Sequence, residues 1–200
     1  MTREERYRWE FRIWAQDLSQ VRRELERLAL PQQPETSAET YLISRATDRC
    51  SAKVRSGTLD LKILLKEHQG LEQWAPVLKA QFPVSATTIA DHLFPALALD
   101  RPHLPTSEYT LDDFLELVKQ EPKISVAQVS KERHEFNLDA CTAEFAAVTI
   151  DGNLHHTVAI ESIEPDAVLQ LARHLAIADK PNTSYVRKLK HVISRSCPVA

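Results

Sequence analysis

Hydrophobic and polar residues alternate one by one in several stretches of this chain, the period of two that is typical of β-strands. Residues 7–14 read YRWEFRIW, with large apolar side chains at every second position and Arg or Glu between most of them. Residues 53–62 read KVRSGTLDLK, two alternating runs on either side of Gly57-Thr58. Because Gly followed by another residue suits a two-residue type II′ loop, we expect a hairpin in which Arg55 pairs with Asp60.

The second half of the chain repeats this pattern. Residues 124–137 alternate imperfectly, and residues 143–150 and 155–162 flank an Asp-Gly-Asn turn. Either Asp-Gly or Gly-Asn could form the two-residue loop, so the register of this hairpin stays open. Both registers place the same residues on one face, namely Glu144, Ala146, Val148, Thr157, Ala159 and Glu161.

Other stretches repeat their apolar residues every three to four positions, as amphipathic helices do. We expect helices over residues 17–30, 85–99 with Ser85 as N-cap and an interruption at Pro95, 111–120 capped by Thr110, 165–175 and 185–192. A short strand is expected at residues 41–44. Residues 64–84 are ambiguous, because Gly70 and Pro76 break the pattern, and we interpret them as a strand end, a loop and a short helix around residues 74–80.

The composition is that of an ordinary folded protein: 200 residues, 43% hydrophobic and 26% charged, with a formal charge of −3. That charge argues against broad nucleic-acid binding, so any basic function must be local. The three cysteines lack a CxxC pair, the charged N-terminus lacks the apolar core of a signal peptide, and no apolar run is long enough to span a bilayer. We therefore expect one domain over residues 1–200, cytoplasmic, without a membrane or a specific nucleic acid as partner; a homodimer stays open.

Four strand segments carry charged side chains on one face, and seven of these side chains are cations. The cations are Arg8, Arg12, Lys53, Arg55, Lys62, Lys131 and Arg133. One interpretation is a set of solvated outer faces with surface ion pairs, which contribute little stability. The other is an antiparallel barrel or tunnel whose charged faces point inward and whose apolar faces lie under helices such as Leu18–Leu28 and Val168–Leu175.

An inward face rich in Arg and Lys is costly unless an anion occupies it. The anion that best matches many Lys and Arg side chains is a chain of phosphates. The few acids among the cations suit Mg²⁺ or Mn²⁺, hard ions that take carboxylate and phosphate oxygens together. Asp60 is interpreted as a partner for Arg55 rather than as a metal ligand. No GxSxG, Walker-type or HExxH motif is present, so those chemistries have no support.

Five segments follow one another in a defined order: a WEFR strand, KVR followed by LDLK, a KER strand, the AEFAAVTIDG–AIES hairpin and a late TSYVRKL segment. In this order and spacing the chain resembles the triphosphate tunnel metalloenzymes, the superfamily that contains the CYTH domain, over roughly residues 7–189. The resemblance implies an α+β fold, an antiparallel eight-stranded β-tunnel (CYTH-like barrel) with helices packed outside. It also implies a triphosphate held on basic residues and a divalent metal held on acids.

The resemblance assigns roles residue by residue. The substrate-binding residues would be Arg8, Arg12, Lys53, Arg55, Lys62, Lys131 and Arg133, of which Lys53, Arg55, Lys131 and Arg133 would also act in catalysis, and the metal ligands would be Glu10, Glu144 and Glu161. Two positions depart from the family's acidic motifs. Arg8 stands where the first Glu of the N-terminal ExExK motif is expected, and Ala159 where the first Glu of the late ExE pair is expected. Val148 also competes with Glu144 for the position of the late-strand acid.

The function implied by the resemblance is a metal-dependent hydrolase of inorganic or organic triphosphate, with Mg²⁺ or Mn²⁺ as cofactor. Its partner would be a triphosphate-containing small molecule or polyphosphate. The alternative is a binding protein rather than an enzyme: a non-catalytic polyphosphate- or nucleotide-binding module in which acidic residues of the metal site have been replaced. A class IV adenylate cyclase-like enzyme, a polyphosphate polymerase-like enzyme and an interaction domain without a ligand also stay open.

Overall fold

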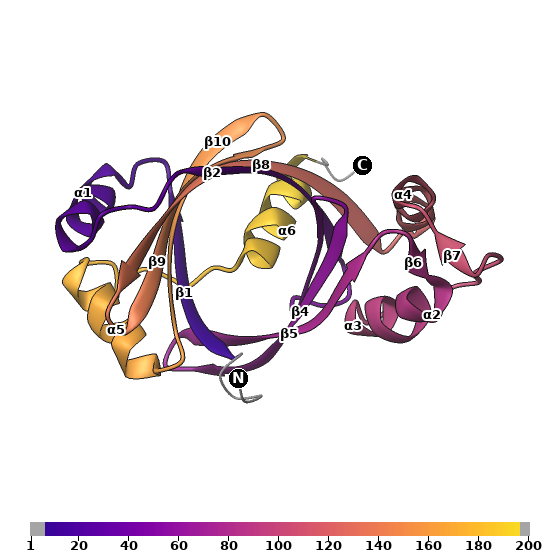
Figure 1. Ribbon diagram of the computed structural model, residues 1–200, viewed down its shortest axis with the longest axis horizontal. Helices are drawn as coiled ribbons and strands as arrows, with labels where there is room; N and C mark the ends of the chain where they lie inside the picture. The colour runs from indigo at the N-terminus through magenta and orange to yellow at the C-terminus, as the bar shows by residue number, and fades with distance from the viewer. Residues whose placement is uncertain (1–6, 197–200) are drawn as a thin grey trace. The chain divides into compact units, whose positions relative to one another are not determined.

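The computed structural model describes residues 7–196 (Figure 1). The strands are β1 (Arg8–Ala15), β2 (Glu35–Ser44), β3 (Cys50–Arg55), β4 (Thr58–His68), β5 (Leu71–Gln81), β6 (Val84–Ser85), β7 (Glu108–Tyr109), β8 (Ile124–Leu138), β9 (Cys141–Ile150) and β10 (Asn153–Ser162). The helices are α1 (Ser19–Leu28), α2 (Ala86–Thr88), the π-helical turn η2 (Ile89–Leu93), α3 (Phe94–Ala96), α4 (Leu111–Gln120), α5 (Pro165–His174) and α6 (Tyr185–Ser196).

Eight of these strands close into a barrel in the order β1-β10-β9-β8-β2-β3-β4-β5, while β6 and β7 form a separate two-stranded sheet. Strand β1 closes the barrel by pairing antiparallel with β10 along one edge and with β5 along the other. The α+β fold with an eight-stranded antiparallel barrel, expected from the alternating segments, is therefore confirmed.

The chain divides into two compact units, each built from several segments. The first comprises residues 1–37, 64–75 and 129–184, and the second comprises residues 38–63, 76–128 and 185–200. Strands β2, β4, β5 and β8 each contribute residues to both units. A single domain over residues 1–200 stays a prediction.

In the first unit, the alternation of β1 separates an apolar face from a charged one. Trp9, Phe11 and Ile13 are at most 6% exposed and belong to one hydrophobic core with residues of α1 and α5. Figure 1 shows α1 and α5 outside the strands of this unit. Because apolar side chains must be removed from water, these helices cover the apolar face of β1, β9 and β10 and leave the opposite face to polar groups. The expected covering of the apolar strand faces by residues 18–28 and 168–175 is confirmed.

The second unit has a core of its own on β3 and β4. Alternate residues of the two strands are buried there, namely Cys50, Ala52, Val54, Leu59 and Leu61. They pack with the helical segment that starts at α2 and with Phe114 and Val118 of α4. The other face of this hairpin carries the charged residues of the KVRSGTLDLK segment, as the alternation predicts.

The β3–β4 hairpin has a different register from the predicted one. Val54 pairs with Leu59, so the two-residue loop is Ser56-Gly57 and not Gly57-Thr58. Ser56 has φ 48° and Gly57 has φ 68°. Positive φ at both loop residues defines a type I′ turn. Because the twist of this turn matches the twist of the strands, the hairpin closes at Ser56-Gly57 and not at Gly57-Thr58. Because the shift moves each partner by two residues, every side chain keeps its predicted face.

The β9–β10 hairpin resolves the alternative that the sequence left open. Ile150 pairs with Asn153, so Asp151-Gly152 is the loop, with φ 48° and 78°. Ala146 lies opposite Thr157 and Glu144 opposite Ala159. The face predicted for both registers is therefore confirmed.

The interpretation of residues 64–84 is wrong in its helical part. Residues 71–81 form strand β5, joined to β4 by a Gln69-Gly70 turn with positive φ at both positions. Both faces of the first half of β5 are buried, with Leu71 and Glu72, then Trp74 and Ala75, at 7% exposure or less. A strand that is covered on both sides has no reason to alternate, so period-two analysis missed it.

The predicted helix over residues 85–99 exists as a broken helical segment. Ser85 is the N-cap, because its Oγ accepts a hydrogen bond from the Thr88 backbone N–H at 3.0 Å. The π-helical turn η2 precedes Pro95, and the helix resumes as α3 with this proline in its first turn. Proline lacks a backbone N–H and fits best at the start of a helix, which explains the break. The predicted Thr110 cap of α4 is also confirmed, with Asp113 N–H donating to its Oγ1 at 3.3 Å.

The two cysteines within the described residues are not reactive groups. Cys50 and Cys141 are buried and carry free thiols. Burial raises the pKa of Cys50 to about 12 and also raises the pKa of Cys141, so neither forms a thiolate near neutral pH. Among the helices of residues 7–196, none is both long and apolar enough to cross a membrane.

Leu25→Ala in α1 is expected to lower the free energy of unfolding by about 2–5 kcal/mol, because it leaves a cavity where a fully buried side chain stood. Leu28→Ala is the matched control on the same helix, since Leu28 is 41% exposed and its truncation should cost only about 0.5 kcal/mol. Urea unfolding followed by tryptophan fluorescence measures both. Equal losses for the two variants would contradict the assignment of the buried face of α1.

Candidate functional site

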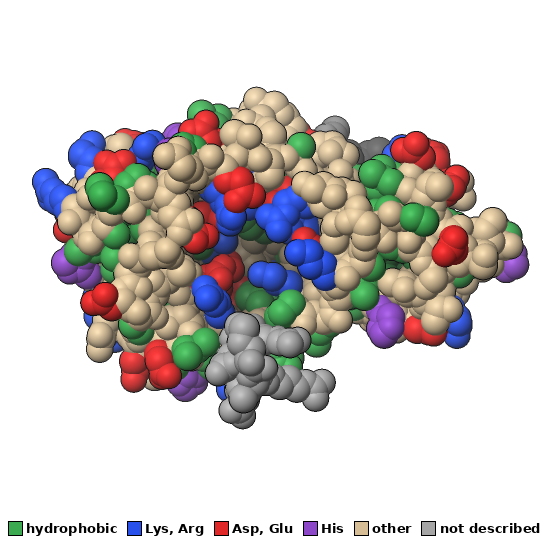
Figure 2. Space-filling model, viewed as in Figure 1, with side chains coloured by type: hydrophobic (Ala, Val, Ile, Leu, Met, Phe, Trp, Pro, Cys, Tyr) green, Lys and Arg blue, Asp and Glu red, His purple; other side chains and the backbone are tan. Residues whose placement is uncertain are grey.

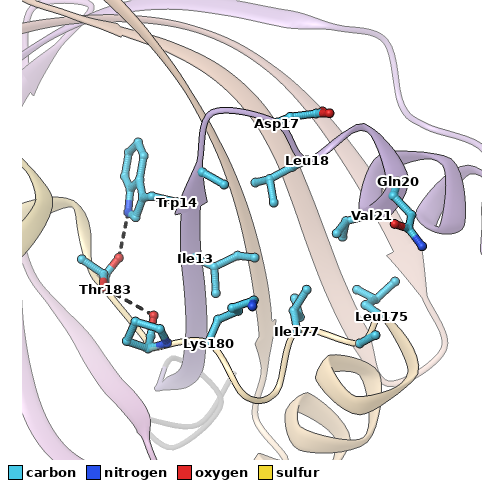
Figure 3. Close-up of a pocket in the computed structure, with 13 residues that line it drawn as sticks. Ile13, Trp14, Asp17, Leu18, Gln20, Val21, Leu175, Ile177, Lys180 and Thr183 are labelled. Carbon is cyan, nitrogen blue, oxygen red and sulfur yellow. Dashed lines mark hydrogen bonds between the residues drawn. The ribbon is translucent and has the colours of Figure 1, made fainter.

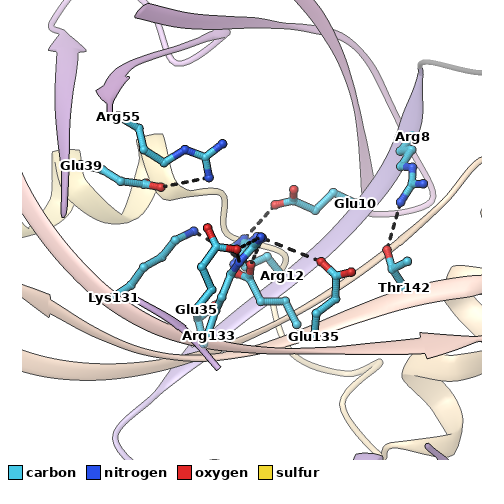
Figure 4. A network of polar contacts seen from close by, with 12 residues as sticks. Arg8, Glu10, Arg12, Glu35, Glu39, Arg55, Lys131, Arg133, Glu135 and Thr142 are labelled. Atoms are coloured by element: carbon cyan, nitrogen blue, oxygen red, sulfur yellow. Dashed lines mark hydrogen bonds and ion pairs between the residues drawn. The ribbon is translucent and has the colours of Figure 1, made fainter. Parts of the chain in front are cut away.

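The charged face of β1 is organised by Arg12, a residue that is only 5% exposed. Its Nε donates to Glu10 Oε1 at 2.8 Å (Figure 4). Its Nη1 donates to Glu144 Oε1 at 3.2 Å and to Thr157 Oγ1 at 3.4 Å. A guanidinium remains charged at any accessible pH and presents its donors in a rigid fork. One arginine therefore links carboxylates that belong to two different strands, β1 and β9.

Glu144 is held by three cations. Besides Arg12, Arg133 Nη1 lies 3.5 Å and Lys131 Nζ 4.0 Å from its Oε2. Burial alone would raise the pKa of this carboxyl, but the charges of Lys131, Arg12 and Arg133 outweigh burial and lower the pKa to about 2. Glu144 is thus ionised at neutral pH, and its charge keeps three basic side chains close together.

Arg133 makes a second set of ion pairs. Its Nε donates to Glu35 Oε2 at 3.0 Å, and its Nη2 donates to the same oxygen. Its Nη1 is also 3.8 Å from Glu135 Oε2. Glu35 is half exposed, at 51%, whereas the Arg133 side chain is 26% exposed. Water therefore reaches the Glu35 end of this network most easily.

Three glutamates occupy neighbouring positions on three adjacent strands of the first unit. Glu10 on β1 lies opposite Glu161 on β10 and opposite Glu72 on β5. Like charges that face each other across a ladder destabilise it unless other groups neutralise them. Glu10 has its contact with Arg12, and Glu72, which is 2% exposed, accepts a hydrogen bond from Trp74 Nε1 at 3.0 Å. The charged face of this unit thus combines acids and bases in one network.

The second unit has a charged face of its own, on β2 and β3. Lys53 Nζ donates to Glu39 Oε1 at 3.0 Å, and Arg55 Nη1 lies 3.8 Å from the same oxygen. The predicted Arg55–Asp60 pair is present at 3.9 Å. Glu39 is 1% exposed, and its other oxygen accepts from the Tyr41 hydroxyl at 2.9 Å. Here one buried carboxylate holds two of the predicted phosphate-binding cations.

Helix α6 begins on this same face. The Tyr185 ring stacks on Tyr41 with centroids 5.5 Å apart, and Lys53 Nζ lies 5.6 Å from the Tyr41 centroid on β2. Tyr41 and Lys53 are cross-strand neighbours, so their side chains share a face. Within the second unit, the first residue of α6 therefore packs on the face of β2 and β3 that carries Tyr41 and Lys53.

The structure brings most of the predicted basic residues together in two groups. Arg12, Lys131 and Arg133 share Glu144 in the first unit, and Lys53 and Arg55 share Glu39 in the second. The other two cations lie apart from these groups: Arg8 donates to Thr142 Oγ1 at 3.1 Å, and Lys62 is exposed opposite Ser51. Figure 2 shows Lys and Arg side chains interspersed with Asp and Glu on the face that it draws. The catalytic, substrate-binding and metal-binding roles of these residues stay predictions.

Three further acids of the network were not recognised from the sequence: Glu35, Glu39 and Glu72. A strand was expected only at residues 41–44, whereas β2 begins at Glu35. The segment ETSAETY places Glu35, Ser37, Glu39 and Tyr41 at alternate positions, so a period-two signal for this face was present. Glu72 lies in the stretch that was interpreted as a loop.

The predicted Mg²⁺ or Mn²⁺ site can be compared with the donors that are present. Glu10 and Glu144, two of the three predicted ligands, already bind Arg12. Glu161, the third, lies opposite Glu10 in the ladder. Over residues 7–196, no group of three or more His, Cys, Asp or Glu side chains is placed to hold a metal ion. The donor set therefore does not fit a divalent ion unless existing ion pairs are broken.

A separate pocket of about 300 Å³ lies in the first unit, between the end of β1, the start of α1 and residues 175–183 (Figure 3). Its lining is mostly apolar, with Ile13, Leu18 and Ile177 among the side chains that form it. Trp14 reaches across its edge and donates from Nε1 to the Thr183 carbonyl at 2.9 Å. None of the predicted site residues lines this pocket.

Comparison with solved structures finds proteins of similar fold. The PH1012 protein of Pyrococcus horikoshii OT3 is 17% identical with a TM-score of 0.54, and the match covers 91% of this chain and 97% of that one. A candidate adenylate cyclase of Bacillus halodurans is 10% identical with a TM-score of 0.52, covering 92% and 98%. HpAC1 of Hippeastrum, described as an adenylyl cyclase candidate with a dominant triphosphatase activity, is also 10% identical at a TM-score of 0.52, covering 92% and 96%.

The likeness is one of fold. No family model and no curated protein matches the sequence. The matches cover 91–92% of this chain and 96–98% of each of these three proteins, so the likeness extends over most of the fold. At 10–17% identity, this likeness concerns the fold and not the roles of individual residues.

Glu144→Gln is expected to lower stability at neutral pH and to flatten its pH dependence. The folded-state pKa of about 2 lies below the ordinary value of 4.5, so the carboxylate stabilises the fold above pH 4.5 and this contribution is lost as the pH falls toward 2. By linkage the contribution is on the order of 3 kcal/mol at neutral pH. Denaturant unfolding of both proteins between about pH 7 and pH 3 measures the difference, which should shrink on acidification.

The control for this variant is Glu116→Gln on α4, where the side chain is 66% exposed and pairs with Lys119. We expect almost no change there, because exposed ion pairs contribute little. If the free energy of unfolding changed with pH in the same way for wild type and Glu144→Gln, the role given to Glu144 would be contradicted.

Proposed function

We propose that this chain binds a phosphate chain, that of a triphosphate-containing small molecule or of inorganic polyphosphate, on the charged faces of its barrel strands. The observation that carries the proposal is the convergence of Arg12, Lys131 and Arg133 within 4.0 Å of the single carboxylate of Glu144. These cations come from β1 and β8, far apart in the sequence. Guanidinium and ammonium groups gathered in a partly dry site are the groups that recognise phosphate oxygens.

A phosphate chain would bind by exchange with carboxylates that now hold the cations. Glu35 is the partner most open to exchange, because it is 51% exposed and bonds to Arg133 through two N–H groups. Both of these N–H groups donate to one Glu35 oxygen, whereas a phosphate group could accept from them with two oxygens and carries more negative charge. Lys53 and Arg55, held by Glu39 in the second unit, offer a second pair of cations of the same kind.

Hydrolysis of the bound triphosphate is the second candidate function. It is favoured by the likeness in fold to HpAC1, whose triphosphatase activity is part of its description, and by the acids Glu10 and Glu161 on neighbouring positions of β1 and β10. In phosphoryl transfer the protein mainly positions the nucleophile and neutralises charge. Arg12 and Lys131 would neutralise the phosphate oxygens, and Glu161 would orient the attacking water. That the chain has neither a membrane nor a specific nucleic acid as partner stays a prediction, and a homodimer stays open.

Inorganic tripolyphosphate is expected to raise the melting temperature of the wild-type protein. Lys131→Ala and Arg133→Ala should each weaken its binding by roughly 10-fold or more, because each removes a charge-assisted contact worth about 1.5–3 kcal/mol. Isothermal titration calorimetry measures the affinities, with ATP and thiamine triphosphate as further ligands. Lys119→Ala on α4 is the matched control, since that side chain is 56% exposed in a local pair with Glu116. The absence of any thermal shift and of any turnover with all three ligands would refute the proposal.

If the protein also hydrolyses triphosphate, Glu161→Gln should reduce phosphate release by roughly 100-fold, because the amide cannot accept a proton from water. Its tripolyphosphate affinity should change far less than its turnover. The products are analysed with and without Mg²⁺ or Mn²⁺. Release of phosphate indicates a hydrolase, a cyclic nucleotide indicates an adenylate cyclase-like enzyme, and longer polyphosphate indicates a polyphosphate polymerase-like enzyme. Full turnover in Glu161→Gln would exclude this residue from the reaction, and binding without turnover in the wild type would favour the non-catalytic module.

A further inference from the structure

The register of the barrel brings Arg12, Ala159 and Glu144 into one row across three strands. Arg12 on β1 pairs with Ala159 on β10, and Ala159 pairs with Glu144 on β9. Strands lie about 4.8 Å apart, so the backbones of the first and third residue are roughly 10 Å apart. An arginine side chain can cover much of that distance only if the residue between is small. Ala159, buried at 1% exposure, leaves the path open, and Arg12 Nη1 reaches Glu144 Oε1 at 3.2 Å.

Ala159 is also the position where the sequence resemblance expected an acid. With Glu at this position, a third carboxylate would stand between Glu144 and the end of the Arg12 side chain. The small side chain at position 159 both removes the expected acid and allows Arg12 to reach Glu144. The result is a fixed positive charge between Glu10 and Glu144, with contacts of 2.8 Å and 3.2 Å.

We propose that the guanidinium of Arg12 takes the place of a divalent cation on this face, so that the chain binds its phosphate ligand without a metal. A cation that joins two carboxylates from different strands does what a bridging metal ion does. Mg²⁺ needs oxygens at about 2.0–2.1 Å in near-octahedral geometry. Arg12 already occupies one oxygen of each carboxylate, Oε1 of Glu10 and Oε1 of Glu144, and its positive charge repels a second cation at this position.

The second part of the proposal, binding without a metal, rests on the proposed function. Near Glu144, Arg12, Lys131 and Arg133 already carry the positive charge that a phosphate chain requires. A divalent ion is therefore not needed to bring the anion to this face. Affinity for tripolyphosphate in EDTA should equal or exceed the affinity in excess Mg²⁺, which lowers the charge of the free ligand.

The decisive experiment titrates Mn²⁺ alone, without any phosphate ligand, and follows the loss of its free six-line electron paramagnetic resonance signal. Wild type is expected to take up no stoichiometric Mn²⁺. Arg12→Ala releases Glu10 and Glu144 from their shared cation and should bind Mn²⁺ at least roughly 10-fold more tightly than wild type. Arg22→Ala on α1 is the matched control: it removes an exposed arginine from a pair with Glu26 at 2.9 Å and should gain nothing.

Stoichiometric Mn²⁺ uptake by wild type that equals that of Arg12→Ala would overturn the proposal. If Arg12→Ala does not fold, the wild type decides by itself: Mn²⁺ uptake, or tripolyphosphate binding that weakens about 10-fold in EDTA, refutes the replacement of the metal. Failure of tripolyphosphate to bind under either condition would reject the proposed function. The Mn²⁺ titration would still decide whether Arg12 occupies the place of a cation.

Discussion

A buried charge must be neutralised where it stands, and the charged faces of this barrel follow from that constraint. Arg12 is 5% exposed and Glu144 is 15% exposed at its side chain, yet each has opposite charges in hydrogen-bonding geometry. Removing one partner would leave the others buried and uncompensated, which costs far more than the pair contributes. The cations in the first unit therefore stay together because the ionised Glu144 carboxylate lies between them. In the second unit, Glu39 holds Lys53 and Arg55 in the same way.

The apolar faces meet the opposite requirement. Trp9, Phe11 and Ile13 alternate with the charged residues of β1 and need cover from water, which α1 and α5 supply. Period two therefore produces both halves of the architecture: a hydrophobic core between strands and outer helices, and a polar network on the other side of the same strands. The likeness in fold to solved structures that are only 10–17% identical is consistent with this pattern being shared while individual residues differ.

The acids on the charged face of β1 and β9 limit the chemistry of this face. An arrangement that binds a metal needs acids whose oxygens are available, and here two predicted ligands are engaged by one arginine. The small residue Ala159 makes that engagement geometrically feasible. Anion binding by side-chain cations and metal binding by carboxylates are thus competing uses of one face, and Arg12 favours the first.

The sequence predicts which residues share a face, because side-chain direction alternates strictly along a strand. Lys53 with Arg55, and Glu144 with Glu161, were assigned correctly even where the β3–β4 register was not. It also determined the helix caps at Ser85 and Thr110, which depend on local hydrogen bonds. The pairing partners of these residues depend on the tertiary structure. The first half of strand β5 was hidden because both of its faces are buried, and the bridging of Glu10 and Glu144 by Arg12 depends on strands that meet only when the barrel closes.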